Sequence, residues 1–170
     1  VHETFRYVYN NIKKNVHLTS ISGGTDIVSC FILGNPNLPV HAGEIQCKAL
    51  GMDVAIFNNN GDEIKQLKGE LVCKTSFPSK PLFFWNDKNN QKFFNAYFNK
   101  YPNVWHHGDY AMHTSKDGFI IYGRSDATLN ASGIRIGTAE LYRIVENIDG
   151  VIESVAVEQT YKDDTRVILF

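Results

Sequence analysis

The chain has 170 residues, of which 43% are hydrophobic, 12% aromatic and 21% charged, a composition typical of folded globular domains. Its 17 Lys and Arg against 18 Asp and Glu give a formal net charge of −1, which excludes the strong basic charge of proteins that bind nucleic acid. The apolar runs are far shorter than the roughly 20 residues that cross a bilayer, so no membrane span is expected.

Three cysteines, Cys30, Cys47 and Cys73, are odd in number and widely spaced. A disulfide framework favours an even count in a smaller chain, so we expect free thiols in a reducing compartment, the cytosol. The chain begins at Val1 and stops on the apolar residues 167–170. Because an uncovered terminal strand invites aggregation, we expect an internal fragment of a longer protein.

The first part of the chain predicts one helix followed by short strands. Apolar residues at helical spacing favour an amphipathic helix over residues 3–14. Glycine and asparagine turns then separate β-prone stretches at 16–20, 27–33, 44–50, 53–57 and 70–74. Short strands at this spacing are typical of a β-barrel or sandwich segment.

The middle of the chain predicts a helix and a hairpin. An aromatic-rich helix is expected over 91–101, stopped by Pro102, and a strand at Trp105 is expected to end in a turn at Gly108-Asp109. The Asp117-Gly118 pair predicts a hairpin over 113–122.

The last part of the chain predicts a second unit. Residues 123–135 are polar and glycine-rich, as expected of a connection between domains. A helix over 138–148, capped by Thr138, and strands over 151–157 and 165–170 would then begin an α+β unit.

The first candidate site is the segment Ser20-Ile21-Ser22-Gly23-Gly24-Thr25-Asp26. Glycines allow a ligand to approach the backbone, hydroxyls bind phosphate oxygens, and a carboxylate can hold Mg²⁺. The Gly-Lys-Ser/Thr ending of a P-loop is absent, and the segment taken alone favours a plain capped turn.

The second candidate is His106-His107-Gly108-Asp109. An aspartate at a strand end can accept hydrogen bonds from both hydroxyls of a ribose, although a turn aspartate fits equally well. Adjacent histidines on a strand point to opposite faces, so they cannot share one metal ion, and no zinc site is expected.

The third candidate covers residues 123–140, where Arg124 and Arg135 bracket turn residues with three glycines nearby. Planar guanidinium groups suit phosphate and ribose oxygens. A solvated linker needs no such pattern, so this segment is the strongest signal for binding.

Together with Gly69-Glu70-Leu71, these segments resemble the adenylate-forming acyl-CoA synthetases. Thr25-Asp26 is similar to the family's Gly-rich Thr-Glu motif, and His107-Gly108-Asp109 is similar to its Thr-Gly-Asp motif. Residues 123–140 resemble its long Gly-Arg-x-Asp…Gly-x-Arg…Glu motif. The four motifs occur in the family's order, and the resemblance covers essentially the whole chain.

Within the family, the acetoacetate-activating branch is most similar, on residues 22–27, 43–46 and 84–87. Acetate-activating members have tryptophans where Ser22 and Gly23 stand. A ligase for acetate or another short-chain acid remains an alternative.

The resemblance implies a two-step ligase whose small-molecule substrates are acetoacetate, ATP with Mg²⁺, and CoA, with AMP as a product. It implies a mixed α+β, strand-rich (α/β) fold in three parts. These are the C-terminal part of the large domain with a barrel-like subdomain at 1–124, a hinge at 125–127, and the start of a small α+β lid at 128–170.

The resemblance also implies roles for individual residues. Those lining the adenine and acyl side would be Ser22, Gly23 and Gly24. Those acting at the phosphates would be Thr25 on the α-phosphate, Asp26 near Mg²⁺, and Arg135. Those contacting the ribose would be Asp109 and Arg124. The hinge would be Asp126, and Ser132 and Gly133 would lie beside the CoA tunnel.

Two parts of the family pattern are missing, namely the Ser/Thr/Gly-rich phosphate loop upstream and the adenylation lysine downstream. We therefore expect this chain to be inactive alone and to need the flanking parts of its own protein. The alternative from another class is a natural, truncated module that binds a nucleotide or a partner without catalysis.

Overall fold

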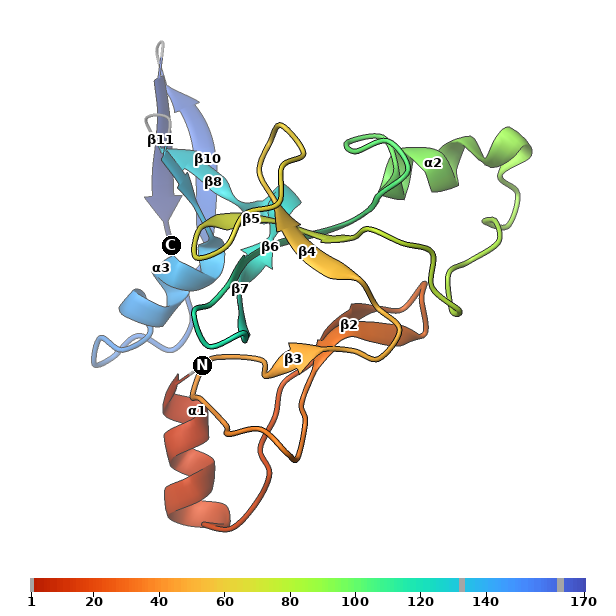
Figure 1. Cartoon of the computed structure of the whole chain (residues 1–170). Coiled ribbons are helices and arrows are strands. Elements are labelled where there is room, and N and C mark those ends of the chain that lie inside the picture. The colour runs from red at the N-terminus through yellow and green to blue at the C-terminus, as the bar shows by residue number, and fades with distance from the viewer. Residues whose placement is uncertain (1, 132–133, 162–163) are drawn as a thin grey trace. The chain divides into compact units, whose positions relative to one another are not determined.

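A computed structural model describes residues 2–131, 134–161 and 164–170 of the chain, traced in Figure 1. The chain forms two compact units, the first made of Val1–His107 and Ala111–Ile121, and the second of Gly108–Tyr110 and Tyr122–Phe170. No helix among the described residues is long and apolar enough to cross a membrane. The strand-rich, mixed α+β character expected from the sequence is confirmed.

The first unit opens with α1 (His2–Tyr7), which continues as the π-helical turn η1 (Val8–Ile12). The expected helix is therefore present but ends before Lys14. Phe5 is buried, whereas Ile12 is exposed, because a π-turn rotates the last residues away from a regular helical stripe. The β-prone stretch at 16–20 forms no strand.

Three antiparallel strands follow in the order β1 (Ser22–Gly24), β2 (Ser29–Leu33) and β3 (Cys47–Lys48). β2 starts two residues later than predicted, because the Val28 N–H donates to the Thr25 carbonyl oxygen at 3.1 Å and closes a turn. The long strand expected at 44–50 is reduced to β3 and an isolated bridge at Ile45.

A second sheet has the order β4 (Val54–Phe57), β5 (Lys68–Cys73), β6 (Trp105–His113) and β7 (Phe119–Arg124). All four residues of β4 are buried, which explains their continuous apolar run. The hairpin predicted around Asp117-Gly118 is confirmed. The turn predicted at Gly108-Asp109 is wrong, because both residues lie inside β6.

Aromatic side chains fill the core of the first unit. The 3₁₀ turn Lys88–Asn90 leads into α2 (Gln91–Tyr97), which ends four residues earlier than predicted. Trp105 is only 2% exposed and stacks on Tyr97, with ring centroids 3.6 Å apart. The residues with rings packed edge-on against Trp105 are Phe77, Phe93 and Phe98.

A buried carboxylate lies on β5 beside this core. Glu70 is 1% exposed and accepts hydrogen bonds from Lys100 Nζ at 2.6 Å and pairs with His106 Nε2 at 3.0 Å. Burying a charge is unfavourable unless it is paired, so the two partners explain how Glu70 is tolerated.

This arrangement predicts unequal costs for removing the two partners. Lys100→Met should lower the free energy of unfolding by about 2–3 kcal/mol, because a buried carboxylate loses its ammonium partner. Glu70→Gln should cost only about 1 kcal/mol, because Lys100, a third exposed, can turn to solvent. Urea unfolding of both variants measures the difference, and a larger loss for Glu70→Gln would contradict this interpretation.

His113 links the stability of the first unit to pH. Its ring is buried and stacks on Phe119 with centroids 4.6 Å apart, and burial lowers the pKa of His113 below its usual 6.5. The unfolded chain then takes up the proton first, so stability is lost as pH falls below about 6.5. We expect His113→Phe, which keeps the stack, to lose less thermal stability between pH 7.5 and 5.5. An unchanged pH dependence would exclude His113 as its source.

The described part of the second unit combines antiparallel strand pairs with the helix α3, drawn in blue (Figure 1). Its elements in chain order are the 3₁₀ turn η3 (Ser125–Ala127), β8 (Leu129–Ala131), β9 (Ile134–Ile136), α3 (Thr138–Val145), β10 (Ala156–Tyr161) and β11 (Asp164–Leu169). β8 pairs with β9, β10 pairs with β11, and β8 also packs against the β10–β11 hairpin.

The helix and strand of the second unit differ in detail from prediction. The N-cap of α3 is Gly137 instead of Thr138, because the Glu140 carboxylate turns back and accepts from the Gly137 N–H at 3.2 Å. The strand predicted at 151–157 begins only at Ala156, although Val155 already exchanges two backbone hydrogen bonds with Phe170.

The three cysteines are free, and only Cys73 is fully buried. Burial raises the pKa of the Cys73 thiol, which keeps it protonated and unreactive near neutral pH.

Candidate functional site

The first candidate segment forms β1 and the turn that leads to β2. A Cβ atom on Gly23 would lie 2.2 Å from the Ser29 carbonyl oxygen, so only glycine lets β1 approach β2 this closely. Ser22 is buried, whereas Thr25 and Asp26 are exposed at the turn. The turn therefore presents a hydroxyl and a carboxylate on a closely packed strand pair.

His107 contacts both strands of this pair within the first unit. Its Nε2 atom lies 3.0 Å from the Gly23 carbonyl oxygen, and its ring packs edge-on against Phe31 at 4.8 Å. A Cβ atom on Gly24 would come within 3.1 Å of the same ring. The histidine of the His107-Gly108-Asp109 motif thus supports the glycine-rich segment, a contact that no sequence pattern indicated.

The two adjacent histidines have different partners, as predicted for neighbours on a strand. His106 pairs with Glu70, and His107 with Gly23. Among residues 2–131, 134–161 and 164–170, no three His, Cys, Asp or Glu side chains gather in a group that could hold a metal ion.

Tyr97 contacts the candidate residue Asp26, and the sequence did not predict this contact. Its phenolic O–H donates to Asp26 Oδ2 across 71 residues of sequence. Nothing in the sequence places the end of α2 beside the β1–β2 turn, so no local signal could have found this contact.

Asp109, Arg124 and Asp126 come together in the second unit. Arg124 Nη1 lies 3.3 Å from Asp109 Oδ1, and Arg124 Nε lies 3.4 Å from Asp126 Oδ1. The Asp109 side chain is 13% exposed, whereas that of Asp126 is 75% exposed. The arginine therefore links a nearly buried carboxylate on β6 to an exposed one in η3.

Gly108 makes room for this arginine. It lies within β6 at φ +84°, and a Cβ atom there would be 2.6 Å from Arg124 Nη2. The guanidinium could move away from a side chain, but it would then lose its position beside Asp109. The Gly108-Asp109 pair, which resembles a turn in sequence, contacts the Arg124 guanidinium in the structure.

Arg135 is tied to the turn before β8. Its Nε donates to Thr128 Oγ1 at 2.8 Å, and its Nη2 donates to the Ser125 carbonyl oxygen at 3.0 Å. Its guanidinium also lies over the Tyr110 ring, 4.4 Å from the centroid. Because Thr128 Oγ1 donates to the same Ser125 oxygen at 2.7 Å, Arg135 and Thr128 together fix the turn that contains Asp126.

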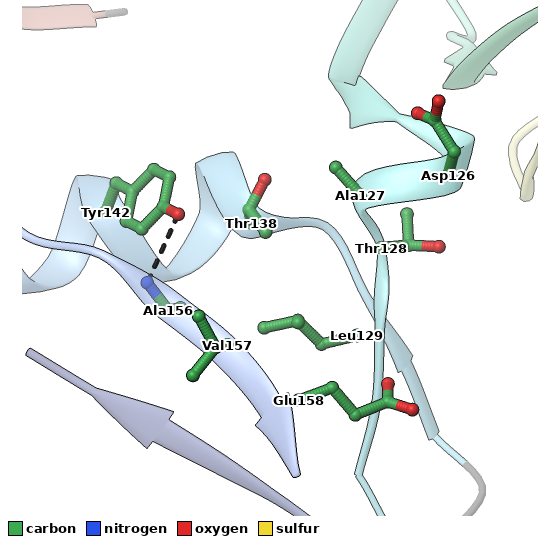
Figure 2. A pocket seen from close by; sticks show the side chains of 9 residues that line it. All are labelled: Asp126, Ala127, Thr128, Leu129, Thr138, Tyr142, Ala156, Val157 and Glu158. Carbon is green, nitrogen blue, oxygen red and sulfur yellow. Dashed lines mark hydrogen bonds between the residues drawn. The ribbon is translucent and has the colours of Figure 1, made fainter.

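A pocket of about 460 Å³ opens beside this turn in the second unit (Figure 2). The Tyr142 hydroxyl on α3 accepts a hydrogen bond from the Ala156 N–H at 3.2 Å and forms one wall. The residues that line the pocket are Asp126, Ala127, Thr128, Leu129, Thr138, Tyr142, Ala156, Val157 and Glu158. Asp126 therefore borders open space, while Ser132 and Gly133 lie outside the described residues.

The sequence-predicted residues thus fall into two groups. Ser22, Gly23, Gly24, Thr25 and Asp26 lie together in the first unit. Within the second unit the structure brings together Asp109, Arg124, Asp126 and Arg135.

Comparison with known proteins gives a consistent result. No family model matches the chain. It is 54% identical over 168 residues to acetoacetyl-coenzyme A synthetase of Rhizobium meliloti (strain 1021), covering 99% of this chain and 26% of that protein. Acetoacetyl-CoA synthetases of Xenopus tropicalis and Caenorhabditis elegans are 49% and 43% identical, each over 99% of this chain and 25% of their own length.

Solved structures agree. Acetoacetyl-CoA synthetase from Streptomyces lividans matches with a TM-score of 0.86 and 37% identity, over 97% of this chain and 25% of that one. An anthranilate CoA ligase in complex with anthranoyl-AMP matches with a TM-score of 0.74 over 96% of this chain and 30% of that one; at 16% identity it shows the shared fold alone. The chain is therefore a homologue of the acetoacetyl-CoA synthetases, shares the fold of the matching part of the Streptomyces lividans enzyme, and spans about a quarter of its relatives' length.

Proposed function

We propose that this chain is one quarter of a cytosolic acetoacetate–CoA ligase, which we call the parent protein. The observation that carries the proposal is the 54% identity to an acetoacetyl-CoA synthetase along 99% of the chain. In the proposed reaction, the acetoacetate carboxylate attacks the α-phosphorus of ATP and pyrophosphate leaves. The CoA thiolate then attacks the carbonyl carbon of the acyl-adenylate, and AMP leaves with the electrons of the broken C–O bond.

In this proposal Asp109 accepts hydrogen bonds from both ribose hydroxyls, and Arg124 contacts the ribose. The position of Arg124, 3.3 Å from Asp109 Oδ1, supports this assignment, because it holds the carboxylate in one orientation. A nearly buried, prepositioned acceptor loses little entropy on binding a nucleotide.

Thr25 would bind the α-phosphate, and Ser22, Gly23 and Gly24 would line the adenine and acyl side. Asp26 offers one exposed carboxylate and, within the described residues, belongs to no group of three potential metal ligands. This suits Mg²⁺ that arrives with ATP, because Mg²⁺ keeps several waters and phosphate oxygens as ligands. When bound, the ion would neutralise phosphate charge, and Asp26 would hold it through one oxygen or a water.

Arg135 would stabilise the negative charge that develops on the phosphate during adenylation. The hinge at 125–127 would turn the lid, residues 128–170, against the large-domain part, residues 1–124. The side chain of Asp126 is 75% exposed, which supports this assignment because little packing would have to break for the backbone there to turn. Ser132 and Gly133 would lie beside the CoA tunnel.

Pyrophosphate exchange by the purified parent protein tests the proposal. We expect ATP–pyrophosphate exchange with acetoacetate to exceed that with acetate by at least about tenfold in kcat/KM, since a site built to bind the extra carbonyl loses that contact with acetate. A preference for acetate would favour the other short-chain ligase. A protein that binds ATP but exchanges pyrophosphate with neither acid would favour the non-catalytic module.

A further inference from the structure

Among the residues that the structure describes, one side chain donates a hydrogen bond to the Asp26 carboxylate. Oδ2 accepts the Tyr97 O–H, whereas Oδ1 carries no hydrogen bond from any part of the chain that the structure describes. Asp26 is exposed at a turn, where an unsupported aspartate samples several rotamers. A single donor on Oδ2 therefore fixes the carboxylate and leaves Oδ1 open.

Tyr97 is itself held firmly. Its ring stacks on the buried Trp105 with centroids 3.6 Å apart and an interplanar angle of 14°. Two further rings, Phe84 and Phe93, pack edge-on at 6.0 and 5.9 Å. The phenol therefore projects from the aromatic core in one direction, and few rotamers remain to be lost when it donates.

The helix that carries Tyr97 is anchored at its other end. The Asp87 carboxylate accepts hydrogen bonds from the backbone N–H groups of Lys92 and Phe93 at 2.9 and 2.8 Å. These bonds satisfy two otherwise unpaired donors of the first turn of α2. A continuous series of contacts therefore leads from Asp87 through α2 and the aromatic core to the Asp26 carboxylate. All of these residues lie in the first unit.

We propose that Tyr97 is a positioning residue for nucleotide binding, which holds Asp26 so that its Oδ1 faces the magnesium-bound phosphates of ATP. This inference rests on the role proposed above for Asp26, and it adds a residue outside the four family motifs. The bond is charge-assisted, and such bonds contribute roughly twice as much as neutral ones. Losing it should weaken binding of the magnesium–nucleotide complex without disturbing the core.

Tyr97→Phe in the parent protein removes the hydroxyl and keeps the ring stack. We expect the Kd for the magnesium complex of α,β-methylene-ATP, measured by titration calorimetry, to rise about tenfold, as loss of one charge-assisted bond predicts. The matched control is Tyr101→Phe, which removes a hydroxyl bonded to the Asn58 carbonyl oxygen at 2.8 Å, and its Kd should stay within about twofold.

A double-mutant cycle separates positioning from a general structural effect. In an Asp26→Asn background, Tyr97→Phe should add little further loss, because the two side chains act as one unit. The effect of Tyr97→Phe should also shrink when EDTA removes Mg²⁺. An unchanged Kd for Tyr97→Phe, or an equal loss with and without the Asp26 carboxylate, would overturn the proposal.

The binding readout is independent of the acyl substrate. If the parent protein shows no acetoacetate-dependent pyrophosphate exchange but the cycle gives the expected coupling, the proposed ligase function is wrong and the role of Tyr97 stands. If exchange is present and the coupling is absent, only the role of Tyr97 is wrong.

Discussion

Asp109→Ala is expected to raise the KM of the parent protein for ATP about 100-fold, since it removes the acceptor of two hydrogen bonds to the ribose. Arg124 also loses its 3.3 Å contact with Asp109 Oδ1, one of the contacts that orient its guanidinium. The effect should appear in KM more than in kcat, because the ribose does not change charge during adenylation. Initial rates of ATP–pyrophosphate exchange at varied ATP measure it.

The matched control for this variant is Asp149→Ala, which removes an exposed aspartate from the same unit. Its KM should remain within about twofold of the wild-type value, as for most surface changes. An Asp109→Ala variant with the same KM as this control would remove Asp109 from the ribose site.

Arg135→Ala is expected to lower kcat for adenylation about 100- to 1000-fold, the usual effect of losing one prepositioned donor to developing charge. The structure adds a second reason, because Arg135 also holds Ser125 and Thr128 beside the proposed hinge. Single-turnover measurements of pyrophosphate release and of thioester formation separate the two contributions.

Arg135→Lys distinguishes charge from geometry. Lysine keeps a positive charge but cannot donate through a fork to Thr128 and Ser125 at once. If the positive charge dominates, Arg135→Lys should recover much of the adenylation rate. If holding the turn matters most, the adenylation rate of Arg135→Lys should be as low as that of Arg135→Ala.

The control for Arg135 is Arg166→Ala. Arg166 on β11 also donates through Nε at 2.8 Å, to Gln159, and lies over a tyrosine ring at 4.1 Å, but its side chain is exposed. This variant should leave both half-reactions unchanged. Equal losses for Arg135→Ala and Arg166→Ala would indicate general destabilisation instead of a role at the phosphate.

Local signals predicted the elements best where a strong turn bounded an apolar run. The Asp117-Gly118 hairpin and the adjacent strands β4 and β5 follow from such signals. The turn predicted at Gly108-Asp109 was wrong, because a glycine at φ +84° can occur in a turn or inside a strand. In the structure Gly108 lies within β6, where a Cβ atom would come within 2.6 Å of Arg124 Nη2.

The sequence indicated the candidate motifs but not the residues that contact and support them. The contact of His107 with Gly23 joins residues 84 apart in sequence, and that of Tyr97 with Asp26 joins residues 71 apart. Spacing within a motif carries no information on such pairs, because they arise from the packing of strands and a helix that are distant in the chain. The same holds for Glu70, whose motif gave no sign of its buried pair with Lys100.

A chimeric enzyme tests most directly whether this chain is part of an acetoacetate–CoA ligase. This chain replaces the matching quarter of the Rhizobium meliloti acetoacetyl-coenzyme A synthetase, with which it shares 54% identity, and acetoacetate-dependent ATP–pyrophosphate exchange is measured. We predict exchange within about tenfold of the unaltered enzyme, a change of about 1.4 kcal/mol in the barrier. A folded graft that binds ATP but shows no acetoacetate-dependent exchange would contradict the claim that this chain is part of an acetoacetate–CoA ligase.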